Sequence, residues 1–405
     1  MRFFVIFFLS LGPVCAGIAL LTVVRPLRLG RAACISLGVA LLACSLKFTW
    51  FGVFGGHVFL PELPSRVIHV MSAGHDFVLV LAGFGVLWAV IRLMWHALRC
   101  GVRRARGARP TMPTVEEMEQ GLTRRRVISG ALACVAAGGA AKGVHEGVRL
   151  PDVVEVELEF PDLPSAFDGY RIAHLSDLHI SAAARADRTA GVVRLVNGCK
   201  PDLIAITGDF VDGSVAARQA DVAPLAELYA PDGVVGCTGN HEYYSGWGAW
   251  RDVFSRYGVR VLENARLLVR HRRHRNQALA ILGENDPVSH DSDIQIAAGM
   301  VPHWAFRILL AHRPTRLAEH AAYGVRLQLS GHTHGGAARG LDRFVARANE
   351  GHVRGIYREH GLTLYVNSGT GQWAGFPARL GVPPEITLLT LRTAHEAGGA
   401  AHAKT

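Results

Sequence analysis

Three long apolar runs in the first 90 residues constrain the fold of this 405-residue chain more than any other feature. They cover residues 3–24, 32–55 and 67–90. The first carries no charge, and the other two are interrupted only by Lys47, His69, His75 and Asp76. A helix needs about 20 apolar residues to cross the hydrocarbon core of a bilayer. We therefore expect three membrane-spanning helices within residues 1–92.

The basic residues indicate how these helices are oriented. The chain has a formal net charge of +10 and a pI near 9.6, but its arginines cluster beside the apolar runs, in residues 25–31 and 92–126. The link between the second and third runs has no Lys or Arg before Arg66. Because cytoplasmic loops carry the excess of basic residues, residues 93–126 are expected to form a basic cytoplasmic linker, with the N-terminus outside. Membrane topology therefore explains the charge better than a nucleic-acid partner does.

A fourth apolar stretch, residues 127–141, decides on which side the rest of the chain lies. As a helix it would reach about 22 Å, short of the roughly 30 Å hydrocarbon core. Basic residues precede it and small residues follow it, as in a signal sequence, and "TRRRVI" resembles the twin-arginine export motif. We expect residues 127–145 to be a fourth apolar segment or an internal export signal, with the remainder on the periplasmic or extracellular side of the inner membrane. The alternative is a packed or interfacial helix and a cytoplasmic domain.

Ionisable residues inside the expected membrane helices have two interpretations. Lys47, His75 and Asp76 lie where a charge is costly and is often functional. Alternatively they pair with one another, or snorkel, and hold the helices together, which is the interpretation we favour.

The pattern changes at about residue 150. Short apolar runs recur and each ends in a polar cluster, as in "YRIAHLSDLH", "PDLIAITGDF", "DGVVGCTGNHE", "AFRILLAHRP" and "VRLQLSGHTH". Helix-like stretches separate several of them, which indicates an α/β domain with substantial parallel pairing. Ligands bind beyond the carboxyl ends of strands in such sheets, so the polar clusters are expected to meet.

The residues that would meet offer imidazole, carboxylate and amide donors. They are Asp177, His179, Asp209, Asn240, His312, His332 and His334. This mixture suits Mn, Fe or Zn better than Mg or Ca. Four imidazoles and two carboxylates exceed the needs of one metal with an open position. They suit two divalent ions about 3.5 to 4 Å apart that share a bridging carboxylate, an arrangement that serves phosphoester displacement.

The blocks "DLH", "GD", "GNHE", a lone His and "GHTH", in this order, resemble the five signature blocks of the calcineurin-like metallophosphoesterases. The resemblance covers residues 153–391, and "SGHTHGG" with the segment after it resembles the membrane-associated YkuE and YaeI-like branch. It implies a four-layer αββα sandwich over residues 150–392. It also implies hydrolysis of phosphomonoesters or phosphodiesters, with a metal-bridging hydroxide as the nucleophile.

The resemblance also implies a role for each matching residue. The first metal would be held by Asp177, His179 and His334. Asp209 would bridge to the second metal, whose other ligands would be Asn240, His312 and His332. His241 would be catalytic, stabilising the transition state and protonating the leaving oxygen, a role that suits an imidazole. Glu242 would orient His241.

Substrate identity is the least constrained part of the sequence. Five arginines follow the last block, at positions 339, 343, 347, 354 and 358, and they suit either substrate phosphate oxygens or a solvated loop. A phosphoester of a lipid or of the cell envelope is the expected substrate. The alternative function is a metal-binding sensor or scaffold coupled to the membrane helices, but the intact ligand set favours an enzyme. Residues 393–405 are small and polar and are expected to form a disordered tail.

Overall fold

The computed structural model describes residues 2–107 and 114–394, and within them the chain forms two compact units. Unit 1 runs up to His145 and includes the short segment Gly375–Ala378. Unit 2 begins at Glu146 and holds the rest of the chain. From residue 395 on, the expected disordered tail lies outside the described residues.

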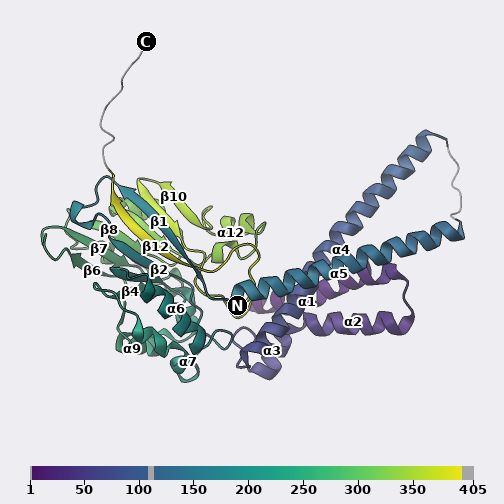
Figure 1. Ribbon diagram of the computed structural model, residues 1–405, viewed down its shortest axis with the longest axis horizontal. Helices are drawn as coiled ribbons and strands as arrows, with labels where there is room; N and C mark the ends of the chain where they lie inside the picture. Colours follow the sequence, from purple (N-terminus) through teal and green to yellow (C-terminus); the bar gives the residue numbers. More distant parts are fainter. Residues whose placement is uncertain (1, 108–113, 395–405) are drawn as a thin grey trace, which may run out of the picture. The chain divides into compact units, whose positions relative to one another are not determined.

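Unit 1 is helical (Figure 1). Its main helices are α1 (Arg2–Ala19), which continues as a π turn and a 3-10 turn to Leu27, α2 (Arg31–Ser45), α3 (Lys47–Gly55), α4 (Ser65–Ala105) and α5 (Val115–Val148). Within the described residues, three helical segments are long and apolar enough to cross a membrane, namely Val5–Leu27, Ser65–Ala105 and Met118–Val148. The second apolar run is not one continuous helix. Its two helices, α2 and α3, meet at 61°, because the chain leaves the helical conformation at Leu46.

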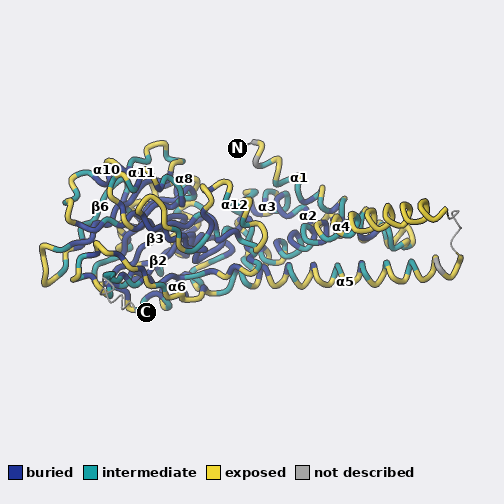
Figure 2. The backbone as a smooth tube through the Cα atoms, turned by 90° about the horizontal axis from the view of Figure 1, so that it is seen from above, coloured by how far each residue is buried: buried dark blue, intermediate teal, exposed yellow. Residues whose placement is uncertain are grey.

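The fourth apolar stretch, residues 127–141, lies in the middle of α5. The segment of that helix that could span a membrane has 31 residues, so it is not limited to the 22 Å that the apolar run alone suggests. The described part of the expected linker, residues 93–126, is largely helical as well, because α4 continues to Ala105 and α5 begins at Val115. Large apolar residues near the end of α4 are exposed. Figure 2 colours this part of the helix as exposed.

Two ionisable residues that were expected inside the membrane helices, Lys47 and His75, contact backbone carbonyl oxygens. The ammonium of Lys47 is fully buried and donates to the carbonyl oxygen of Gly375 at 2.7 Å. Nδ1 of His75 lies 3.0 Å from the carbonyl oxygen of Ser45, at the end of α2. Both contacts lie within unit 1, but they are made to backbone carbonyl oxygens, whereas the favoured interpretation has these residues pairing with one another or snorkelling.

Unit 2 contains two six-stranded sheets. In order across the first sheet the strands are β1 (Asp152–Phe160), β12 (Glu385–Thr393), β2 (Arg171–Leu175), β3 (Leu203–Thr207), β4 (Val234–Cys237) and β5 (Val259–Val261). In order across the second they are β10 (Gly355–Glu359), β11 (Leu362–Val366), β9 (Val325–Ser330), β8 (Phe306–Leu310), β7 (Ala278–Gly283) and β6 (Ala265–Arg270). Strands β2 to β5 are mutually parallel, and so are β7, β8, β9 and β11.

The two sheets pack face to face and helices cover their outer faces. Apolar side chains of both sheets form one buried core, which includes Leu203 and Ile308. Helices α6 (Ala186–Gly198), α7 (Val215–Val222) and α9 (Trp247–Arg256) accompany the first sheet, and α10 (Ile294–Ala298) and α11 (Leu317–Ala322) the second. The central strands are buried on both faces, which explains their continuous apolar sequences. This arrangement confirms the predicted four-layer αββα sandwich.

Candidate metal centre

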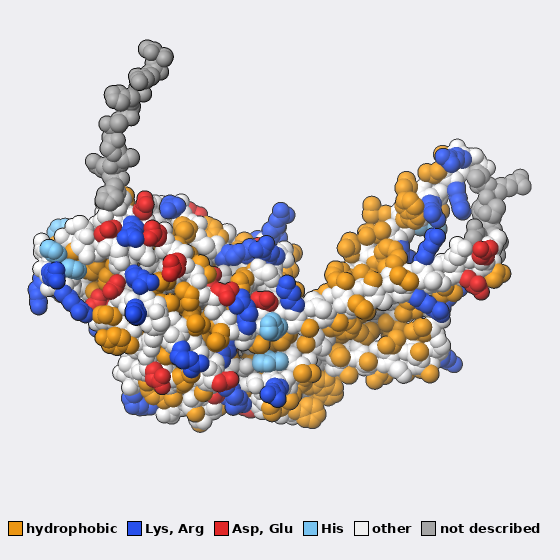
Figure 3. All heavy atoms as spheres, viewed as in Figure 1, with side chains coloured by type: hydrophobic (Ala, Val, Ile, Leu, Met, Phe, Trp, Pro, Cys, Tyr) orange, Lys and Arg blue, Asp and Glu red, His pale blue; other side chains and the backbone are white. Residues whose placement is uncertain are grey.

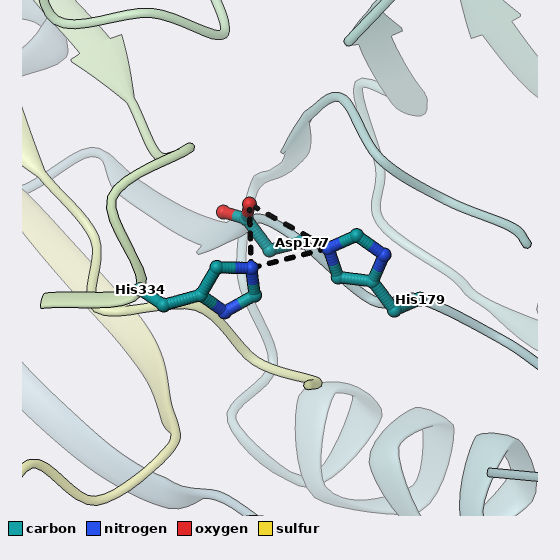
Figure 4. Close-up of side chains that lie close together, drawn as sticks. All are labelled: Asp177, His179 and His334. Atoms are coloured by element: carbon teal, nitrogen blue, oxygen red, sulfur yellow. Dashed lines mark hydrogen bonds and ion pairs between the residues drawn. The ribbon is translucent and has the colours of Figure 1, made fainter. Parts of the chain in front are cut away.

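Every predicted metal ligand follows the carboxyl end of a parallel strand. The ligand-bearing turns come after β2, β3 and β4 of the first sheet and after β8 and β9 of the second. The two sheets therefore contribute donors to one site from opposite sides. Three side chains of that site are drawn in Figure 4, and they come from the turns after β2 and β9.

Asp177, His179 and His334 form the first donor group (Figure 4). Nε2 of His179 lies 3.1 Å from Nε2 of His334, and Oδ1 of Asp177 lies 3.5 Å from Nε2 of His334 and 4.0 Å from Nε2 of His179. Neutral imidazole nitrogens and a carboxylate oxygen that converge in this way can coordinate one cation.

Asp209, His312 and His332 form the second donor group. Nδ1 of His332 lies 3.1 Å from Nε2 of His312, which lies 3.2 Å from Oδ2 of Asp209. The same Asp209 oxygen lies 3.6 Å from Nε2 of His179 in the first group. Burial favours the neutral form of Asp209, but the charges of His312 and His241 outweigh it and lower the pKa of Asp209 well below its usual range. Asp209 is thus an anion shared by both groups.

Asn240 supplies the observation that best tests whether these residues fit a metal. It lies at the start of the short helix α8 (Asn240–Tyr244), and its side-chain Oδ1 is buried without a hydrogen-bond donor among the described residues. A buried amide oxygen without a donor is costly, because it has lost water and gained no partner. A cation held by the second donor group would satisfy it.

The backbone of the site is strained in a way that sequence motifs alone do not show. Five of the predicted ligands have positive φ, namely Asp177 (53°), His179 (43°), Asp209 (53°), His332 (69°) and His334 (47°). Such conformations are uncommon outside glycine and concentrate at functional sites. Gly208, with φ of 78°, allows a close approach at the same turn, because a Cβ there would lie 2.8 Å from Nδ1 of His312.

In two of the histidines, His312 and His179, the ring nitrogen Nδ1 faces away from the site and lies against an oxygen acceptor. Nδ1 of His312 donates to the carbonyl oxygen of Thr207 at 2.7 Å, and Nδ1 of His179 lies 3.1 Å from Oδ2 of Asp212. An imidazole that donates through Nδ1 keeps the Nε2 lone pair for a metal. Asp212 stands three residues after Asp209 in the same turn, outside the motifs that point to the other site residues.

Asp212 also binds the predicted proton donor. Its Oδ1 lies 2.6 Å from Nδ1 of His241, whose backbone N–H donates to Oδ1 of Asp209 at 2.9 Å. Burial of the imidazole lowers the pKa of His241. The negative charges of Asp209 and Asp212 raise it by more, so the pKa of His241 is raised to about 9. His241 is therefore protonated at neutral pH in the absence of cations, with Nε2 left for a substrate.

The predicted role of Glu242 needs a correction. Its carboxylate accepts hydrogen bonds from the backbone N–H groups of Asp209, Phe210 and Gly239, at 2.8, 2.7 and 2.7 Å. Because its oxygens are used in this way, Glu242 fixes the turns that carry Asp209 and Asn240, whereas Asp212 holds the ring of His241.

A second residue beside the site, the buried Arg379, was also not predicted from the sequence. Its guanidinium donates to the carbonyl oxygens of Ser368, Gly369 and Gly371 and to the side chain of Gln372. Its Nη2 lies 3.2 Å from Nδ1 of His334. Burial lowers the pKa of Arg379 to about 9. Nothing in "FPARLG" signals this contact, because it depends on the fold of the segment after β11.

The arginines that follow the "GHTH" turn are placed differently. Arg354 donates to the carbonyl oxygen of Gly335 at 2.6 Å and pairs with Asp342. Arg339 donates to the carbonyl oxygen of Gly381. Among the described residues, the side chains of Arg343 and Arg347 have no hydrogen bond or ion pair, and both are exposed. The structure shows no contact between these two side chains and the predicted metal ligands.

An αββα sandwich with two histidine and carboxylate groups joined by one aspartate defines a metal-dependent phosphoesterase domain. Residues 170–336 match the calcineurin-like phosphoesterase family. An uncharacterized metallophosphoesterase of Aquifex aeolicus (strain VF5) is 32% identical over 248 residues, which cover 59% of this chain and 91% of that protein. The chain belongs to the calcineurin-like metallophosphoesterases, a family of metal-dependent phosphoester hydrolases.

Two further relatives match a similar part of the chain. The uncharacterized metallophosphoesterase YkuE of Bacillus subtilis (strain 168) is 28% identical over 292 residues, 67% of this chain and 98% of YkuE. A transmembrane protein with metallophosphoesterase domain from Danio rerio is 30% identical over 267 residues, 63% of this chain. The match spans 60% of the length of the Danio rerio protein. With the apolar helices of unit 1, this similarity indicates a membrane protein.

Proposed function

We propose that this protein is a membrane-anchored phosphoesterase with two metal ions, which hydrolyses phosphomonoesters or phosphodiesters of lipids or of the cell envelope. The observation that carries the proposal is the position of Oδ2 of Asp209, 3.6 Å from Nε2 of His179 and 3.2 Å from Nε2 of His312. One oxygen shared by two donor groups supports a pair of cations, because a single ion could not use all of these donors and keep a position for substrate.

The residues divide into two ligand sets. Asp177, His179, His334 and Asp209 would hold one cation, and Asp209, Asn240, His312 and His332 the other. When bound, divalent ions of the Mn, Fe or Zn type would supply positive charge that polarises the phosphoryl group and activates water. The backbone N–H of His332, which donates to Asp177 at 3.0 Å, keeps that carboxylate turned toward the site.

His241 would protonate the leaving oxygen. Its Nδ1 is held by Asp212 at 2.6 Å, so its Nε2 is the nitrogen that can reach a substrate. The side chain is 16% exposed, which gives a leaving group access to it. Asp212 would stabilise the protonated ring before transfer and fix its orientation throughout.

We also propose that unit 2 lies on the periplasmic or extracellular side of the inner membrane. If α2 and α3 together form one span, the chain crosses four times from an outside N-terminus, and the basic residues between α4 and α5 remain in the cytoplasm. The test is a pair of reporters fused after Leu150, one active only in the periplasm and one only in the cytoplasm. Activity of the cytoplasmic reporter alone would overturn this orientation.

The catalytic proposal is tested on the full chain by metal analysis together with turnover of a soluble aryl phosphoester. We expect about two metal ions per chain, and a loss of roughly 100-fold or more in kcat for His241→Gln with the metal content unchanged. His303→Gln, at an exposed position outside the site, is the matched control. Full metal content without turnover in the unmutated protein would instead favour the sensor function.

A further inference from the structure

Helix α12 (Asp342–Ala348) carries an apolar surface that no other described part of unit 2 covers. Leu341, directly before it, is 51% exposed, and Phe344 is 68% exposed. Residues three apart on a helix share a face, so these side chains form one apolar patch with Ala348. An exposed Phe beside an exposed Leu costs hydration free energy in water, and such patches commonly mark interaction sites.

Two unpaired arginines lie beside this patch. Arg343 and Arg347 are four residues apart, so their guanidinium groups are neighbours on one side of α12. Both are exposed, and neither has an ion pair among the residues that the structure describes. Like charges at this spacing destabilise a helix slightly, and an anionic partner would remove that repulsion. Figure 3 shows Lys and Arg side chains gathered where α12 lies in Figure 1, next to hydrophobic side chains.

The helix is attached to the metal-binding turn. Arg354 donates to the carbonyl oxygen of Gly335, directly after His334, and also binds the carboxylate of Asp342 at the start of α12. A Cβ on Gly336 would lie 3.0 Å from Oδ1 of Asp342, so the turn and the helix are in close contact. Whatever binds α12 is therefore held beside the metal centre.

We propose that α12 docks on an anionic lipid bilayer surface, with Leu341 and Phe344 at the acyl boundary and Arg343 and Arg347 among the phosphate groups. A short helix with aromatic and aliphatic residues beside arginines fits that boundary. Arginine suits it because its long apolar stem can lie along the lipid while its guanidinium binds phosphate bidentately. Helix α5 continues from the apolar segments into unit 2, so the bilayer is present at a high effective concentration and a small patch suffices.

This docking adds a substrate class to the proposed function, because the phosphoesters brought to the metal centre would be those of lipid headgroups. That one point rests on the proposed function. Substrates carried at the bilayer surface would reach the site without leaving the membrane. The binding itself does not depend on turnover, so it can be tested separately.

The test uses the full chain in nanodiscs and measures amide hydrogen exchange. We expect the amides of residues 341–348 to be more protected in nanodiscs with phosphatidylglycerol than in nanodiscs of phosphatidylcholine alone. The internal control is α10, which also exposes an apolar side chain, Ile296, but follows Asp291 and Asp293. Equal exchange of residues 341–348 in both lipids would overturn the proposal. The proposal would also be overturned if inorganic phosphate added to phosphatidylcholine nanodiscs protected residues 341–348 as much as phosphatidylglycerol does. The arginines would then bind a free anion.

A variant pair makes the prediction quantitative. Arg343→Gln with Arg347→Gln should remove the lipid-dependent protection and weaken binding of residues 341–348 to the anionic surface by roughly 30-fold, taking about 1 kcal/mol for each arginine. The matched control is Arg256→Gln with Arg260→Gln, a pair that is likewise exposed and four apart. Unchanged protection in the first pair would contradict the proposal.

The same nanodiscs report on the catalytic centre through a soluble aryl phosphoester. The α12 variants should turn it over within about twofold of the unmutated protein, because their side chains lie outside the ligand sets. Lipid-dependent protection without turnover of the aryl phosphoester would contradict the proposed function and support the docking. Turnover of the aryl phosphoester without lipid-dependent protection of residues 341–348 would support the proposed function and contradict the docking.

Discussion

Oδ1 of Asp212 lies 2.6 Å from Nδ1 of His241, and Oδ2 of the same carboxylate lies 3.1 Å from Nδ1 of His179. One carboxylate thus holds both the proposed proton donor and a proposed metal ligand. The charges of both histidines outweigh its burial and lower the pKa of Asp212 below its usual range, so it is ionised. This pairing links the geometry of the metal site to the protonation of the leaving group.

We predict that Asp212→Asn lowers kcat for an aryl phosphoester by about 10- to 100-fold, the usual effect of losing a carboxylate behind a metal ligand. Asp212 raises the pKa of His241, so its loss lowers that pKa. A general acid is active below its pKa, and the alkaline limb of kcat/KM should therefore move to lower pH. The pH profile is the measurement, and Asp232→Asn, which alters a carboxylate bound to Tyr170, is the control. An alkaline limb that stays in place would contradict this role.

Glu242→Gln should act on stability more than on chemistry. The carboxylate accepts three backbone N–H groups, and an amide oxygen can replace only part of that. We expect a loss of about 1 to 3 kcal/mol in the free energy of unfolding, measured by denaturant titration. The alkaline limb of the pH profile should stay where it is. A shift as large as that of Asp212→Asn would restore Glu242 as the partner of His241.

Asn240→Ala should weaken the binding of one metal ion and leave the binding of the other unchanged. Asn240 belongs to only one of the two ligand sets, and its Oδ1 has no donor among the described residues. We expect metal titration to show that one site weakens by at least about tenfold, while the site formed by Asp177, His179 and His334 retains its affinity. Asp209→Ala should weaken both sites. Equal loss of both metals in Asn240→Ala would argue against the assigned sets.

Arg379→Lys should weaken the site that contains His334. The lysine keeps the positive charge but cannot bind three carbonyl oxygens and Gln372 at once, so the segment from Ser368 to Gln372 loses its anchor. We expect about a tenfold loss of metal affinity at that site, measured by titration with Mn²⁺ and its electron paramagnetic resonance signal. Arg256→Lys is the exposed control. An unchanged titration would mean that Arg379 supports the loop without positioning His334.

The seven proposed metal ligands could be expected to lie together from the sequence, because each follows a strand within a short motif of recognisable order. The αββα sandwich was predictable for the same reason. The partner of His241 was not, because Glu242 and Asp212 are both close to ligands in the sequence and only the fold decides which ring each carboxylate reaches. Arg379 was not predictable either, since it stands 45 residues after His334. The break between α2 and α3 lies in an apolar run whose composition gives no signal for it.

The positive φ angles of five ligands have a consequence for how such domains change over time. A glycine at any of these positions would relieve backbone strain and remove a metal donor in the same step. Loss of a metal donor and relief of backbone strain therefore lie in the same mutational direction. A homologue with glycine at one of these positions keeps a less strained turn but lacks a donor for the metal, so a preserved fold is no guide to whether a homologue still works as an enzyme.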